Sequence, residues 1–229
     1  LILIIFFQRN SEEDQINHPD KLAFYSELVN SLDNIKKTII HGFKETKLRL
    51  LLIVTLIFNI FGFPLISLVP VYGKNNLSLN EFDIGILTSS EGLGALIGSL
   101  IIAKISPQKK LSILFLTGCI GFFIGMITFS ISPNLFSAFV CLTFGGIFLS
   151  GFSTMQGALT YRSANKGARG HNFGILVTCI GLAPLGLVYL SFLIVSFPVE
   201  NLIQINCCIA LTLLISIGYL IYKKYFITF

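Results

Sequence analysis

Six uninterrupted apolar runs dominate this sequence, and each is about as long as a helix that crosses a lipid bilayer. The runs cover residues 48–71, 84–104, 110–131, 135–158, 171–195 and 199–222. A spanning helix needs roughly 20 apolar residues, whereas a spanning strand would alternate apolar and polar residues with a period of two. Because backbone groups in hydrocarbon must be satisfied within their own segment, the runs predict six transmembrane helices.

The composition agrees with a membrane protein. The 229 residues are 54% hydrophobic and 12% charged, whereas soluble proteins carry about 25% charged residues. The net charge of +5 would suggest nucleic-acid binding in a soluble protein, but here the placement of the charges matters more, and we expect no nucleic-acid partner. We therefore predict an all-α membrane protein, a six-transmembrane-helix bundle whose surroundings are the lipid bilayer.

The polar part of the chain precedes the first long run. Residues 8–47 carry apolar side chains at three- and four-residue steps, the period of an amphipathic helix. We predict a cytoplasmic linker whose helix lies along the membrane surface, with a solvated linker helix as the alternative. Residues 1–7, LILIIFF, are too short to span and are interpreted as the truncated end of a preceding transmembrane helix. The bundle then covers 48–222, and 223–229 form a cytoplasmic tail.

The basic residues lie in alternate connections. One set of connections holds thirteen of them: Lys36, Lys37, Lys44, Lys47, Arg49, Lys104, Lys109, Lys110, Arg162, Lys166, Arg169, Lys223 and Lys224. The other connections hold Lys74 together with Glu81, Asp83 and Glu200. Because lysine and arginine accumulate in cytoplasmic loops, we predict a multi-pass protein of the cell (cytoplasmic or inner) membrane with both ends of the bundle cytoplasmic.

Glycines recur at helical spacing inside several runs. Gly94 with Gly98, and Gly121 with Gly125, form two GxxxG pairs, and Gly145, Gly146 and Gly151 form a further cluster. Such residues let helix backbones approach closely in a membrane. They predict helix packing, with sliding surfaces in a moving protein as the alternative. Pro64, Pro70 and Pro184 predict kinks in their helices.

Glu91 places a carboxylate about a third of the way into the second run. A charge at the centre of a bilayer costs about 2.5 kcal/mol or more on insertion scales, so such a residue usually faces a cavity or a partner. Three roles remain open. Glu91 can carry a proton, complement a cationic substrate, or form a structural hydrogen bond, for example through Ser89 or Ser90.

Two amides also lie inside the runs. Asn59 is near the middle of the first run, and Gln156 is towards the inner end of the fourth. Amides often join transmembrane helices through hydrogen bonds, and this is the simpler interpretation of each. The five cysteines lie inside apolar runs without metal-ligand spacing, so we expect no metal and no cofactor.

Three segments carry a resemblance to a known family. The segment EGLGALIGSLIIAKISPQKK (residues 91–110), the segment GFSTMQGALTYRSANKGARGHNFG (151–174) and the segment IGLAPLG (180–186) resemble helices eight, ten and eleven of the drug- and siderophore-exporter branch of the major facilitator superfamily. The stump, the basic linker and the six runs together resemble the C-terminal half of such a transporter, helices seven to twelve.

The resemblance implies a function. It implies a secondary active transporter, with proton-coupled export of a small-molecule substrate by alternating access, whose N-terminal six-helix half is missing from this chain. It makes Glu91, Asn59 and Gln156 candidates for the substrate or proton pathway. A cytoplasmic gate loop is then formed by Arg162, Lys166 and Arg169. The alternative role of these residues is to set the membrane topology and to contact lipid headgroups.

Other classes of function are less well supported. No HExxH or GxSxG motif and no intramembrane acid pair occurs, so we expect no enzyme and no catalytic residue. A non-transporting six-helix scaffold or accessory subunit remains the alternative to the transporter.

Overall fold

The computed structural model describes residues 46–105, 111–163 and 169–226, with side chains from 48 to 218 outside the two gaps. All regular elements in these ranges are helices, and six helical segments are long and apolar enough to cross a membrane. The spans are Leu48–Asn75, Glu81–Ile105, Leu111–Ser130, Leu135–Ser163, Arg169–Leu193 and Val199–Gly218. They match the six predicted runs within a few residues, and the predicted six-helix bundle is confirmed. The stump at 1–7 and the linker at 8–47, up to residue 45, lie outside the described residues.

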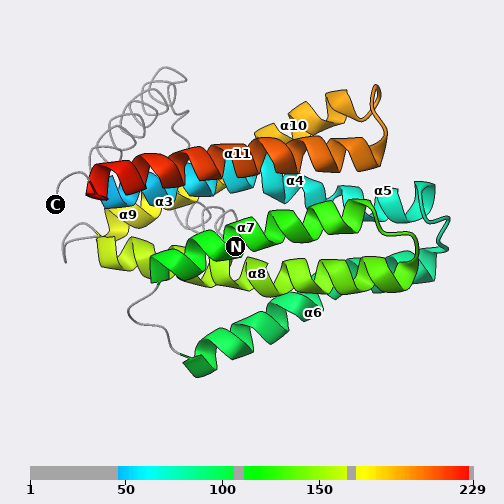
Figure 1. Ribbon diagram of the computed structural model, residues 1–229, viewed down its shortest axis with the longest axis horizontal. Coiled ribbons are helices and arrows are strands. Elements are labelled where there is room, and N and C mark those ends of the chain that lie inside the picture. The colour runs from blue at the N-terminus through cyan, green and yellow to red at the C-terminus, as the bar shows by residue number, and fades with distance from the viewer. Residues whose placement is uncertain (1–45, 106–110, 164–168, 227–229) are drawn as a thin grey trace, which may run out of the picture. The chain divides into compact units, whose positions relative to one another are not determined.

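Three continuous helices pack side by side through glycine contacts. They are α6 (Glu81–Ile105), α7 (Leu111–Ser130) and α8 (Leu135–Ser163), and Figure 1 shows α8 between the other two. On α6, a Cβ at Gly94 would overlap the carbonyl of Thr143 on α8, and a Cβ at Gly146 would overlap the carbonyl of Glu91. Helix α6 therefore touches α8 backbone to backbone, which the GxxxG pattern predicted.

The α7–α8 contact is built in the same way. A Cβ at Gly125 would lie 2.7 Å from Cα of Gly145, and one at Gly118 would lie 2.5 Å from the backbone nitrogen of Phe152. A Cβ at Gly121 would overlap the ring of Phe148. Both predicted GxxxG pairs therefore lie at close helix contacts, and α8 presents one small-residue face to α6 and another to α7.

The first and fifth spans, in contrast, are interrupted. The first span consists of α3 (Thr46–Ile57), a π-helical turn η1 (Phe58–Gly62), α4 (Phe63–Ile66) and α5 (Leu68–Asn75). The fifth consists of α9 (Arg169–Ile180) and α10 (Ala183–Leu193). The prolines predicted to kink their helices lie at these interruptions, because a proline has no N–H for the carbonyl four residues before it.

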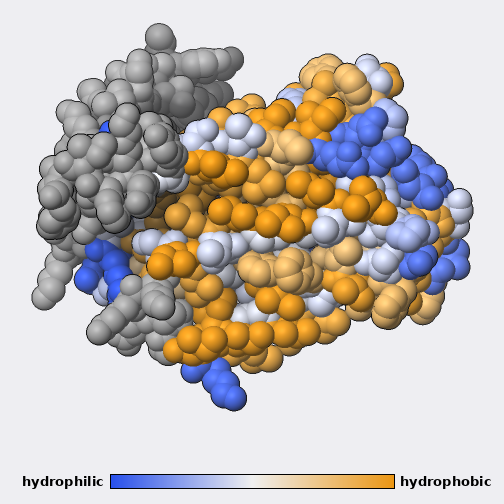
Figure 2. Space-filling view, viewed as in Figure 1, coloured by the Kyte–Doolittle hydropathy of each residue, from blue (hydrophilic) through white to orange (hydrophobic). Residues whose placement is uncertain are grey.

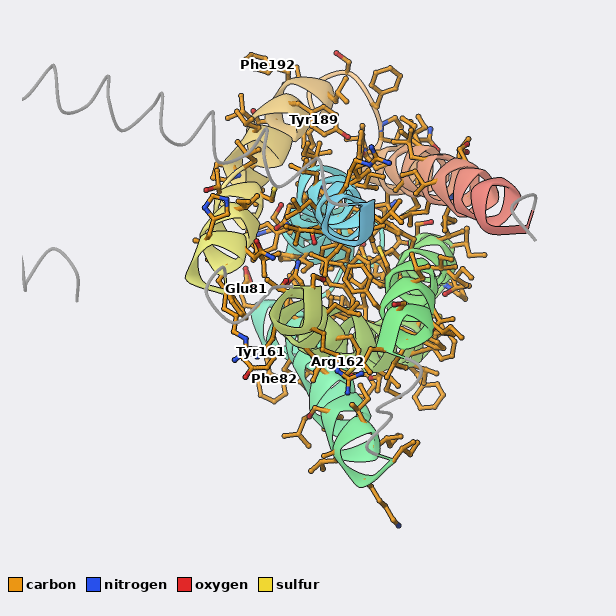
Figure 3. The ribbon with its side chains drawn as sticks, turned by 90° about the vertical axis from the view of Figure 1, so that its left-hand side faces the viewer. Glu81, Phe82, Tyr161, Arg162, Tyr189 and Phe192 are labelled. Carbon is orange, nitrogen blue, oxygen red and sulfur yellow. The ribbon has the colours of Figure 1, made fainter. Side chains whose placement is uncertain are left out.

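The first span lies inside the bundle. Figure 3 shows it surrounded by α7, α8, α9–α10 and the last span, α11 (Val199–Phe226). Phe58 on this span stacks on Phe152 of α8 with ring centroids 4.2 Å apart and contacts Phe122 of α7 at 5.1 Å. Large apolar side chains such as Phe82, Phe136 and Phe192 point outward instead and are more than 70% exposed. Figure 2 shows a broad apolar surface along the visible face, as expected for a bundle whose solvent is lipid.

Candidate functional site

A group of three buried polar residues joins the first span to the fourth. Thr55 is completely buried, while Asn59 and Gln156 are 5% and 8% exposed. The Gln156 Nε2 donates a hydrogen bond to the Thr55 hydroxyl at 2.8 Å, and the Asn59 Nδ2 donates to the Thr55 carbonyl at 2.9 Å. Asn59 and Gln156, both expected from the sequence, therefore meet on Thr55, and these three residues are called the Thr55 group.

Local structure explains how the group forms. Thr55 and Asn59 are four residues apart on one helix face, so the Asn59 amide reaches back to the Thr55 carbonyl. Asn59 lies in the π-helical turn, in which the N–H of Phe63 bonds to the carbonyl of Phe58, five residues earlier. Single π-turns within α-helices frequently occur at functional sites. The irregular turn thus carries one of the two amides of the group.

The depth of the group places it well inside the membrane. Thr55 lies seven residues after Leu48, and Gln156 lies seven residues before Ser163, the two ends of their spans on the same side of the bundle. At a rise of 1.5 Å per residue, the hydrogen bond lies about 10 Å from those ends. On the other side, the Phe58–Phe152 stack covers it with aromatic rings.

The two amides still have capacity for another partner. Among the described residues, the side-chain oxygens of Asn59 and Gln156 accept no hydrogen bond. The completely buried side-chain atoms without a partner are Thr143 Oγ1, Arg169 Nε and Asn206 Oδ1, and the two amide oxygens are not among them. Asn59 and Gln156 can therefore accept hydrogen bonds from a ligand or from water without breaking their bonds to Thr55.

Glu91 lies apart from the Thr55 group. Its backbone carbonyl meets α8 at Gly146, ten residues before Gln156, which is about 15 Å along the helix. Its side chain is partly buried and makes no hydrogen bond or ion pair with a described residue. The neighbouring hydroxyls do not serve it, since Ser89 and Ser90 donate to the carbonyls of Ile86 and Leu87 on their own helix. The structural alternative through those serines is therefore absent here.

Two residues of the predicted gate loop, Arg162 and Arg169, lie at the end of the bundle where α8 finishes and α9 begins. The Arg169 guanidinium stacks on the ring of Tyr161 at 3.9 Å, a cation–π contact that joins these two helices. Arg162 is exposed on the last turn of α8, and Figure 3 shows it with Tyr161 at the end of that helix. Lys166 lies outside the described residues, so the loop is only partly defined.

The opposite end of the bundle is held by polar contacts. The Tyr72 hydroxyl donates to the carbonyls of Ser130 and Ser132 at 3.0 and 3.2 Å, which joins the first span to the end of α7. The Asn76 amide donates to the Glu200 carboxylate at 2.8 Å, which joins the same span to the start of α11. An exposed Lys74–Glu81 ion pair at 3.5 Å adds little, because both side chains remain in water.

Some of these residues were missed by sequence reasoning. Thr55 is a polar residue one helical turn before Asn59, and this spacing could have predicted that the two side chains lie on one helix face. Asn172 and Asn206 are also buried amides within α9 and α11, and Asn206 donates to the Leu202 carbonyl at 2.8 Å. The role of Tyr161 could not be predicted from the sequence, because only the fold brings its ring over Arg169.

Comparison with known proteins identifies the family. A profile of the Major Facilitator Superfamily matches residues 1–186 and, in an overlapping second match, residues 50–225. Each match covers more than half of the chain. The chain belongs to the Major Facilitator Superfamily. No curated protein and no solved structure gives a significant match.

Family and fold agree on the broad class. The Major Facilitator Superfamily consists of membrane transporters, and the six spanning helices make this member a multi-pass membrane protein. Within the described spans, the Thr55 group is a buried polar contact between the first and fourth spans, and Glu91 is a separate carboxylate on the second span.

Proposed function

We propose that this superfamily chain is the C-terminal half of a proton-coupled exporter of small molecules that works by alternating access. The two halves of such a transporter rock against each other around a binding site near the middle of the membrane. The resemblance to the drug- and siderophore-exporter branch supports the direction of transport and the choice of half. The six-helix unit then lies in the cytoplasmic or inner membrane of the cell, with both of its ends on the cytoplasmic side.

The Thr55 group is the observation that carries this proposal. A scaffold has little reason to keep two amide oxygens unused inside a bilayer, because each polar group there costs free energy unless it is paired. In a transporter, the same acceptors bind the substrate while Thr55 holds both amides in place. The aromatic stack of Phe58 and Phe152 gives the substrate an apolar surface beside them.

Glu91 is proposed as the proton carrier. Its carboxylate is partly buried and without a partner among the described residues. A charged carboxylate is costly when the site closes to water, and a protonated one is not, so each closure couples to uptake of a proton. The backbone carbonyl of Glu91 meets α8 at Gly146, about 15 Å along that helix from Gln156. The proton and the substrate therefore use different positions on the path.

Arg162, Lys166 and Arg169 are proposed to form the gate loop on the cytoplasmic side. The Arg169–Tyr161 contact supports this role, because it holds the start of α9 on the end of α8. Contact with lipid headgroups is the alternative role of these residues.

An efflux assay tests the proposal. Cells that express the full-length protein are loaded with ethidium, a lipophilic cation, and with an uncharged lipophilic dye, and retention of each is followed with and without a protonophore. We expect faster efflux of at least one dye, abolished by the protonophore and reduced at least tenfold in Gln156→Ala. Gly157→Ala is the matched control, because a Cβ there meets nothing within 4 Å. Efflux of neither dye, or efflux that is insensitive to the protonophore and to Gln156→Ala, would favour the scaffold.

A further inference from the structure

Helices α6 and α8 meet through a reciprocal backbone contact. A Cβ at Gly94 on α6 would overlap the carbonyl of Thr143 on α8, and a Cβ at Gly146 on α8 would overlap the carbonyl of Glu91 on α6. Each glycine lies three residues after the residue of its own helix that takes part in the other contact. As alternate spans, the two helices run in the same direction. Glu91 and Thr143 therefore hold equivalent positions, directly across the contact from each other.

Both residues have a polar group without a partner. The Thr143 Oγ1 is completely buried and takes part in no hydrogen bond within the described part of the chain. By contrast, the hydroxyls of Thr88 and Thr160, on the same two helices, bond to carbonyls of their own helix. The Glu91 carboxylate also has no partner among the described residues. An unused hydroxyl thus lies across the contact from an unused carboxylate.

No other charge lies near Glu91 among the described residues. On α6 the nearest charged residue is Asp83, eight positions away, or about 12 Å along the axis. The elements that pack against α6 are α5 and α8, and their described titratable side chains are Tyr72, Lys74, Cys141, Tyr161 and Arg162. The first three have partners at the opposite end of the bundle, namely Ser130, Glu81 and Ser132. The last two lie about 22 Å or more along α8 from Gly146.

We propose that Thr143 is a positioning residue for proton exchange at Glu91, and that its hydroxyl donates a hydrogen bond to the charged carboxylate across the α6–α8 contact. This inference rests on the proposed role of Glu91 as the proton carrier. The backbones touch at this level, so rotation about the side-chain bonds of Glu91 brings the carboxylate to the hydroxyl. When a proton from water adds to the carboxylate, the new O–H donates to the Thr143 oxygen, because a hydroxyl both donates and accepts.

The hydrogen bond favours the charged form of Glu91. A hydrogen bond to an ionised group is roughly twice as strong as one between neutral groups. The Thr143 hydroxyl therefore opposes the cost of burying the charge, and it allows the carboxylate to release its proton while it is still partly buried. Without the hydroxyl, Glu91 would hold its proton more tightly and release it only at higher pH.

Infrared difference spectroscopy on the full-length protein in lipid nanodiscs follows this proton. The C=O stretch of the protonated Glu91 carboxyl is assigned as the band lost in Glu91→Gln, and its intensity is titrated against pH. We expect Thr143→Val, which replaces the hydroxyl by a methyl group, to raise the proton affinity of Glu91 about tenfold. Thr143→Ala also lacks the hydroxyl and should give the same shift, whereas Thr143→Ser keeps it and should restore the wild-type titration.

Thr88→Val is the matched control. Thr88 lies about one turn before Glu91 on the same helix, and its hydroxyl bonds to the carbonyls of Ile84 and Gly85, so this variant should titrate as the wild type does. A wild-type titration in both Thr143→Val and Thr143→Ala, or an equal shift in Thr88→Val, would overturn the inference and leave Glu91 as the proton carrier. If Glu91→Gln removes no titrating band, the proton-carrier role itself is wrong, and this inference is wrong with it.

Discussion

At the scale of single residues, the hydrogen bond from Gln156 to Thr55 joins the fourth span to the first. The Gln156–Thr55 bond connects two spans through residues that are 101 positions apart in the chain, and both side chains are buried. Interhelical hydrogen bonds in membranes are worth about 0.6–2 kcal/mol. A bond of that strength positions the amide groups without locking the two spans together.

A double-mutant cycle measures this bond. Gln156→Leu leaves the Thr55 hydroxyl buried without its partner, so we expect the free energy of unfolding to fall by about 1–3 kcal/mol. Thr55→Val in the same protein removes the stranded hydroxyl, and the double variant should recover about 1 kcal/mol of the loss. Unfolding of the full-length protein in mixed micelles reports both values. Strict additivity of the two substitutions would show that the bond contributes nothing.

The carboxylate of Glu91 gives the second prediction at this scale. Glu91→Gln keeps the size of the side chain and removes the ability to release a proton, so dye efflux should fall to the background level while the protein still inserts. Ser89→Ala is the matched control, because the Ser89 hydroxyl bonds only within its own helix, to the Ile86 carbonyl. Efflux that keeps its wild-type dependence on pH in Glu91→Gln would exclude Glu91 as the proton carrier.

At the scale of elements, glycines lie at the contacts of both the continuous helices and the interrupted ones. Helices α6, α7 and α8 approach so closely that a single Cβ at Gly94 or Gly125 has no space. The first and fifth spans are instead divided by prolines and meet through Gly186. Glycine therefore allows close backbone contact in both places, between continuous helices and where two interrupted helices meet.

Two glycines on α6 provide a matched test of the close contact. A Cβ at Gly94 would overlap the Thr143 carbonyl, whereas a Cβ at Gly92, two residues away, meets nothing within 4 Å. We expect Gly94→Val to lower the free energy of unfolding by about 1–3 kcal/mol, the usual cost of overpacking, and Gly92→Val to change it by much less. Thermal unfolding of the two variants in the same detergent compares them directly. Equal destabilisation would mean that α6 and α8 are not in contact.

At the scale of the whole molecule, the described spans divide the polar residues between two ends. Tyr72, Asn76 and Glu200 hold one end together through hydrogen bonds, while Arg162 and Arg169 lie at the other. Lysine and arginine are retained on the cytoplasmic side of membranes. This distribution leads to a prediction for the orientation of the full-length protein.

Labelling of single cysteines in intact cells tests that orientation. Asn134→Cys lies between α7 and α8 at the end that carries Glu200, and it should react with a membrane-impermeant maleimide. Arg162→Cys, at the opposite end, should react only after the membrane is permeabilised. Both positions are exposed, so access depends on the side of the membrane and not on burial. The reverse pattern would invert the bundle and place the proposed gate loop outside the cell.

The sequence by itself determined the class of fold. Runs of about 20 apolar residues leave the backbone in hydrocarbon no alternative to the helix, so the number of spans and their limits followed from local physics. The GxxxG pairs and the prolines likewise marked close contacts and interruptions, because these effects act within one or two helical turns. For the same reason, Asn59, Gln156 and Glu91 were recognisable as polar residues in an apolar setting.

Only the tertiary structure decided which of these residues meet. No local pattern joins Gln156 to Thr55, separates Glu91 from both, or places Gly186 against Ile60. Such contacts depend on how helices far apart in the chain pack and rotate about their axes. In a bilayer no hydrophobic force selects that packing, so it rests on the fit of small residues and a few hydrogen bonds across the bundle.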